Sequence, residues 1–72
     1  MNTDILKGQW KQIKGEVQKQ WGKLTSDELD VINGDRVKLE GRLQEKYGYT
    51  RDQVKQEIDD FLATYEDQDL RR

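Results

Sequence analysis

The chain has 72 residues, of which 39% are charged and 32% hydrophobic, and its formal net charge is −2 at pH 7. It contains no cysteine and no histidine, which excludes disulfides, thiol chemistry, catalytic triads with a histidine base and histidine-ligated zinc. This length predicts one small domain. Because there is no long apolar run and no basic-then-apolar N-terminus, we expect no membrane span, no secretory signal and a cytoplasmic location.

The charges are unevenly distributed along the chain. Residues 1–24 carry five lysines against two acidic residues, whereas residues 25–72 carry eight basic against thirteen acidic residues. The first part therefore has a net charge of +3 and the second of −5. Because the whole chain is acidic, a nucleic-acid partner is not expected, and we expect a monomer.

The first predicted helix covers about residues 4–22. Asn2, Thr3 and Asp4 are candidate N-caps, and Gly22 is the glycine expected after the helix end. Apolar residues recur at helical spacing on one narrow stripe: Leu6, Trp10, Ile13, Val17, Trp21 and Leu24. We interpret the two tryptophans as core residues rather than as a stacking platform for bases or sugars, since the stripe also holds Ile and Val.

A short second helix is predicted at about residues 26–32. Thr25 and Glu28 match the capping-box pattern that starts a helix. The dipeptide Asn33-Gly34 is a strong turn signal that ends it.

The third predicted helix covers about residues 36–47. Its N-cap is Asp35 or Asn33, and Gly48 is the expected residue after its end. Leucines and a tyrosine repeat every fourth residue along it, which indicates one buried face.

A fourth helix is predicted at about residues 51–66, opened by a second capping box of Thr50 and Gln53. The residues from 67 to 72 are charged and unpatterned, so we expect a frayed tail there. The apolar positions of all four helices predict one core: Trp10, Ile13, Val17, Trp21, Leu29, Ile32, Leu39, Leu43, Tyr47, Val54, Ile58, Phe61 and Tyr65.

An internal duplication relates residues 8–22 to residues 34–48. The glycines at positions 8, 15 and 22 align with those at 34, 41 and 48. The repeat predicts an all-α fold, in which two crossed helical hairpins form one four-helix domain over residues 1–66. The alternative is a loose antiparallel bundle.

Gly15 and Gly41 lie at matching mid-helix positions opposite the apolar stripes. A glycine there costs about 1 kcal/mol relative to alanine. Two solvent-facing glycines inherited through the duplication are one explanation. We favour the other, a close approach of a neighbouring helix or of a partner molecule to the bare backbone.

Two sequence stretches carry a family resemblance: GQWKQIKGEVQKQWGKLT at residues 8–25 and NGDRVKLEGRLQEKYGYTRDQ at residues 33–53. With the aromatic-containing last helix, they resemble the CsbD-like bacterial stress proteins. The resemblance implies a small helical protein of the crossed-hairpin kind also seen in SAM-like domains, made under the general stress response. It brings no established reaction and no ligand site.

The sequence offers no pattern for catalysis, metal binding or cofactor binding. The acidic groups Asp27, Glu28 and Asp30, and likewise Glu57, Asp59 and Asp60, lack the spacing of a calcium loop, and no phosphate-binding loop is present. We therefore predict a protein that is not an enzyme and has no cofactor.

The only candidate partner-binding residues are Lys7, Lys11 and Lys14, which flank the apolar stripe of the first helix. They can meet an anionic partner, or they can face solvent and oppose the acidic later helices. The predicted function is that of a non-enzymatic stress protein, similar in its polar composition to the hydrophilin class of protectants. The alternative is a small helical binding module for a protein or nucleic-acid partner.

Overall fold

The computed structural model describes the backbone of residues 6–70 and the side chains of residues 6–65. This part of the chain is all-helical, with α2 (Trp10–Gln20), α3 (Ser26–Ile32), α4 (Arg36–Tyr47) and α5 (Arg51–Leu70). Residues 6–8 are helical as well, and Gln9 separates them from α2. The all-α class predicted from the sequence is therefore confirmed for the described residues.

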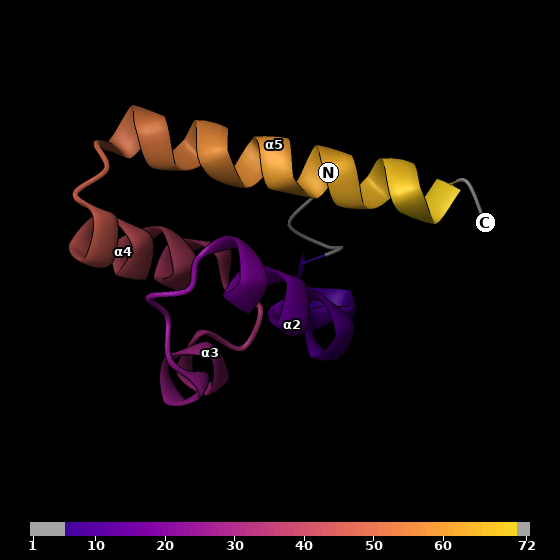
Figure 1. Cartoon of the computed structure of the whole chain (residues 1–72), viewed down its shortest axis with the longest axis horizontal. Coiled ribbons are helices and arrows are strands. Elements are labelled where there is room, and N and C mark those ends of the chain that lie inside the picture. Colours follow the sequence, from indigo (N-terminus) through magenta and orange to yellow (C-terminus); the bar gives the residue numbers. More distant parts are fainter. Residues whose placement is uncertain (1–5, 71–72) are drawn as a thin grey trace.

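α4 and α2 lie between α5 on one side of the molecule and α3 on the other (Figure 1). α5 runs along one side of the molecule and packs on α4, to which a short turn connects it. α3 lies on the side away from α5 and contacts both α2 and α4. Trp21, which directly follows α2, contacts Phe61 of α5, with the two ring centroids 5.3 Å apart.

Both predicted capping boxes are present. The Thr25 hydroxyl accepts a hydrogen bond from the Glu28 amide at 3.2 Å, and the Glu28 carboxylate accepts one from the Thr25 amide at 3.0 Å. Thr50 and Gln53 make the same reciprocal pair at 3.1 and 2.9 Å. Each box satisfies two amide donors that a helix start otherwise leaves without a partner.

α4 has the ends that its sequence predicts. Of the two N-cap candidates, the structure selects Asp35, whose carboxylate accepts from the amides of Val37 and Lys38. Gly48 ends the helix in the left-handed conformation, with φ of 72°.

The first helix differs from its predicted bounds of 4–22. Gln9 interrupts it, and it ends at Gln20, because Trp21 leaves the helical conformation with φ of −126° as its side chain enters the core. The described glycines with positive φ are Gly34 and Gly48, so Gly22 does not form the left-handed helix end that the sequence predicts. The candidate caps at positions 2–4 lie outside the described residues.

The last helix also differs, since α5 continues to Leu70 rather than ending near residue 66. No glycine or proline occurs in residues 51–70, so nothing in the local sequence terminates the helix. Residues 67–70 of the predicted tail are therefore helical, and residues 71–72 lie outside the described part.

The core contains ten of the thirteen predicted residues, and Leu6, Leu24 and Leu62 join them. The other three predicted members, Tyr47, Phe61 and Tyr65, are only partly buried and pack against its edge. They lie at the edges of the apolar stripes, so part of each side chain remains accessible to solvent. Fully burying a large aliphatic side chain contributes about 1.5–3 kcal/mol, so this cluster is the main source of stability.

Among the described side chains, three ion pairs join successive helices. Lys14 pairs with Asp30 between α2 and α3 at 3.3 Å, and Lys46 pairs with Glu28 between α3 and α4 at 3.1 Å. Arg36 pairs with Asp59 between α4 and α5 at 2.8 Å. Such pairs add little stability individually, but they select the relative placement of neighbouring helices.

The glycine that approaches another part of the chain is Gly34. A Cβ atom at this position would lie 2.8 Å from the Lys7 Cα and 3.1 Å from the Leu6 carbonyl oxygen. No side chain fits there without a backbone shift. Gly34 also has φ of 81°, a conformation that favours glycine.

The close contact expected inside the fold at Gly15 and Gly41 is absent. A Cβ atom added at either glycine would meet no described atom within 4 Å. Both glycines are exposed. The expected close approach of a neighbouring helix is therefore wrong. The other possibility, a close approach by a partner molecule, stays a prediction.

Candidate binding surfaces

The three predicted partner-binding lysines lie in the N-terminal helical region, but they differ in environment. Lys7 and Lys11 are exposed. Lys14 is half-buried, and its ammonium group pairs with Asp30. Lys14 therefore has a structural contact, whereas the other two present their charge to solvent.

A hollow of about 160 Å³ lies beside these lysines, between α2 and α3. Gly15 forms part of its lining, together with Lys11, Lys14, Gln18, Ser26 and Leu29. The Gln18 amide donates to the Leu24 carbonyl at 3.3 Å and so closes one side.

A second hollow, of about 360 Å³, lies between α3 and α4. It is lined by Val31, Lys38, Gly41, Arg42 and Glu45. Val31 is 53% exposed here, and Arg42 and Glu45 pair across 3.4 Å. The matching glycines of the two repeats thus both border surface hollows, which are open to solvent.

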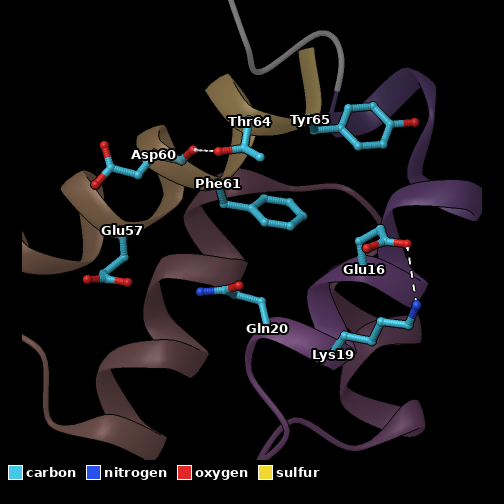
Figure 2. A pocket seen from close by; sticks show the side chains of 8 residues that line it. All are labelled: Glu16, Lys19, Gln20, Glu57, Asp60, Phe61, Thr64 and Tyr65. Atoms are coloured by element: carbon cyan, nitrogen blue, oxygen red, sulfur yellow. Dashed lines mark hydrogen bonds and ion pairs between the residues drawn. The ribbon is translucent and has the colours of Figure 1, made fainter. Parts of the chain in front are cut away.

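A third depression is a groove of about 300 Å³ between α2 and α5, which we call the α2/α5 groove (Figure 2). Its lining comes from two short stretches, Glu16, Lys19 and Gln20 on α2 and Glu57, Asp60, Phe61, Thr64 and Tyr65 on α5. The Phe61 ring projects from α5 toward α2 and forms its apolar centre.

Phe61 is held in place from behind by the core. Its ring packs against Trp21 at a tilt of 56°, a geometry that aromatic pairs prefer. The ring is only partly buried, so its other side faces the α2/α5 groove. A molecule that touches Phe61 in the groove is therefore separated from the buried Trp21 by this one side chain.

Acidic side chains dominate the α2/α5 groove. Among the described residues that line the groove, Glu57 and Asp60 belong to α5 and Glu16 to α2, and Lys19 is the one cation. Lys19 lies 3.9 Å from Glu16 at an exposed position, so their attraction is weak and screened. The groove consequently has a negative electrostatic potential.

Tyr65 closes one end of the α2/α5 groove. Its hydroxyl lies 2.9 Å from the Gln9 amide oxygen and 3.2 Å from that of Gln12. These side-chain contacts join α5 to the start of α2.

Three members of the acidic groups considered from the sequence make contacts between helices. Glu28 belongs to the α3 cap and pairs with Lys46, while Asp30 pairs with Lys14. Asp59 pairs with Arg36. Among the described residues, no group of three or more His, Cys, Asp or Glu side chains is arranged to hold a metal ion.

Two ionisable groups have shifted pKa values. The hydrogen bond from the Thr25 amide, assisted by Lys46, lowers the pKa of Glu28. Burial disfavours the charged form of Arg36, but hydrogen bonds and charge attraction to Asp59 and Glu40 outweigh it and raise the pKa of Arg36. Both shifts stabilise the charged forms that join neighbouring helices.

Sequence reasoning did not identify the α2/α5 groove. On α5, the spacing of Glu57, Asp60 and Phe61 places them on one flank of the helix, which was a usable signal. Nothing in the sequence, however, brings that flank opposite Glu16 and Gln20 of α2.

In the described residues, no helix is long and apolar enough to cross a membrane.

Comparison with known proteins places the chain among bacterial relatives. A family model described as CsbD-like matches residues 4–56. The UPF0337 protein YjbJ of Escherichia coli strain K12 is 51% identical over 61 residues, which cover 85% of this chain and 88% of that protein.

Two further relatives agree with this result. The UPF0337 protein RPA4217 of Rhodopseudomonas palustris is 55% identical over 64 residues, covering 89% of this chain and 97% of the relative. The UPF0337 protein PA4738 of Pseudomonas aeruginosa is 44% identical over 61 residues, covering 85% and 94%. No solved structure matches significantly. The family model and the full-length relatives together show that this chain belongs to the CsbD-like family.

Proposed function

We propose that the chain is a non-enzymatic bacterial stress-response protein that protects other macromolecules during water loss, in the manner of a hydrophilin. The observation that carries this proposal is the polar surface of a folded domain. Among the described residues, the exposed large hydrophobic side chains are Val31 and Val37. A surface with so few apolar groups resists self-association when the protein is concentrated. Membership of the CsbD-like family supports the stress context.

The test is protection of a labile enzyme through drying and rehydration. The chain should preserve more activity than an equal mass of an unrelated small acidic protein. A Trp21→Ala variant, expected to lose roughly 3–5 kcal/mol of stability, shows whether the folded surface is required. Equal recovery with the chain and with the unrelated protein removes the proposal.

The second candidate function is a helical binding module for an anionic partner. It is favoured by the exposed charges of Lys7 and Lys11, which lie four residues apart in the N-terminal helical region. The test is a pull-down from stressed cells with a Lys7→Glu/Lys11→Glu variant. Lys19→Glu/Lys55→Glu, with the same charge change elsewhere, is the matched control. A partner that the control variant loses as well is not bound by this face.

Three finer statements belong to the same proposal. The internal duplication supports two crossed hairpins of the SAM-like kind within a single domain over residues 1–66. The polar surface supports a monomer, which sedimentation at increasing concentration tests. The absence of cysteine fits a cytoplasmic location, which cell fractionation tests.

A further inference from the structure

We propose that the α2/α5 groove binds a short basic peptide segment of a partner protein, with the stem of a lysine or arginine side chain lying on Phe61. This is a specific recognition site, and it goes beyond the general protective role proposed above. Its elements are the negative charge of the groove walls, the accessible aromatic ring at the centre and an amide side chain that faces the opening (Figure 2).

The charge of the groove selects a cationic occupant. Carboxylates stand on both walls, with Glu16 on α2 and with Glu57 and Asp60 on α5. Their combined field attracts positive groups and repels anions. The carboxylate of Asp60 accepts a 2.8 Å hydrogen bond from the Gln56 amide and points away from the Phe61 ring (Figure 2), so it contributes to the field of the groove rather than to contact at the ring.

The aromatic centre distinguishes a basic side chain from a bare cation. Charge attraction alone is weak at an exposed site, about 0–1 kcal/mol per pair. The methylene stem of a lysine or arginine adds apolar contact with the Phe61 ring, while its charged end remains near the carboxylates and the ring face. Because Phe61 packs on Trp21, it offers this contact without rearrangement.

The shape of the groove favours a peptide over a small aliphatic polyamine. The α5 wall extends from Glu57 to Tyr65, about 12 Å at 1.5 Å per residue. An extended peptide covers this length with about four residues. The Gln20 side-chain amide points into the groove, and it carries both the donor and the acceptor that match a peptide backbone.

The probe is the peptide acetyl-Lys-Ala-Lys-Ala-amide, in which the two lysines share one face of an extended chain. Binding to the full chain is measured by titration calorimetry and by tryptophan fluorescence, since Trp21 contacts Phe61. We expect saturable binding that weakens at least tenfold in Glu57→Gln/Asp60→Asn. Glu45→Gln/Asp52→Asn, with the same charge change outside the groove, should weaken it less than twofold. Thermal melts establish that all variants are folded.

Two further variants test the geometry. Lys19→Gln should strengthen peptide binding, because it releases Glu16 and removes the one cation among the described residues that line the groove. Gln20→Leu should weaken peptide binding severalfold and leave spermidine binding unchanged. The proposal is overturned if the two double variants lose affinity equally, if spermidine binds wild type as tightly as the peptide does, or if no saturable peptide binding occurs at low ionic strength.

Discussion

The substitution Gly34→Ala tests the close approach of Gly34 to the backbone of Lys7 and Leu6. Two costs apply. With φ of 81°, an L-residue pays roughly 1–2 kcal/mol for the left-handed conformation. The new Cβ also meets the Lys7 Cα at 2.8 Å, and this neighbour is backbone, which cannot rotate away. Overpacking of this kind costs about 1–3 kcal/mol.

The expected loss is therefore about 2–5 kcal/mol, reduced by the smaller entropy of an alanine-containing unfolded chain, about 0.4–1 kcal/mol. A domain of this size has a total stability of only about 4–11 kcal/mol. Urea unfolding followed by tryptophan fluorescence measures the difference, with an unchanged dependence on denaturant as evidence that both states remain comparable.

Gly48 provides the matched control. Its φ is 72°, but a Cβ there meets nothing within 4 Å. Gly48→Ala should thus pay the conformational cost alone, and Gly48→Asn should be milder, since asparagine tolerates this conformation. Gly34→Asn should remain costly because the contact persists. Equal losses at positions 34 and 48 would refute the close approach.

Three further predictions concern helix propensity, caps and pH. Gly15→Ala and Gly41→Ala should each raise stability by several tenths to about 1 kcal/mol in urea unfolding, and a loss at either would show an intramolecular contact. Thr25→Ala and Thr50→Ala should each lose about 1 kcal/mol, with faster amide exchange confined to the affected helix start. Because the folded-state pKa of Glu28 is lowered, its contribution to stability is complete above about pH 4.5 and disappears as the pH falls through the lowered value. Glu28→Gln should show a weaker decline in that range, and identical acid profiles would exclude this role.

Much of the local structure was predictable because its causes are local. A capping box is a reciprocal contact between residues three apart, so Thr25 with Glu28 and Thr50 with Gln53 specify two helix starts wherever the helices pack. The apolar spacing likewise identified most of the core, since a residue on the middle of a stripe is buried against any neighbour.

The features that sequence reasoning missed depend on how distant segments meet. Phe61 and Tyr65 fit the apolar stripe of α5, yet each lies where the stripe borders the α2/α5 groove rather than a packed helix. The end of α2 was mispredicted for a related reason. The propensity of Gly22 for a left-handed turn matters less than the burial of Trp21, which turns the chain one residue earlier.

The duplication explains both the success and the failure of the glycine argument. Gly8 and Gly34 begin the two repeats, and equivalent sequence positions encourage the expectation of equivalent contacts. Yet Gly34 lies against the backbone of Lys7 and Leu6, whereas a Cβ atom added at Gly8 would meet nothing within 4 Å. The starts of the two repeats thus contact each other asymmetrically, and the missing side chain of Gly34 makes room for the contact. A sequence repeat preserves helix boundaries, because these depend on local sequence. It does not preserve the contacts between the repeats, because the first repeat meets the second with a different surface from the one that the second presents to the first.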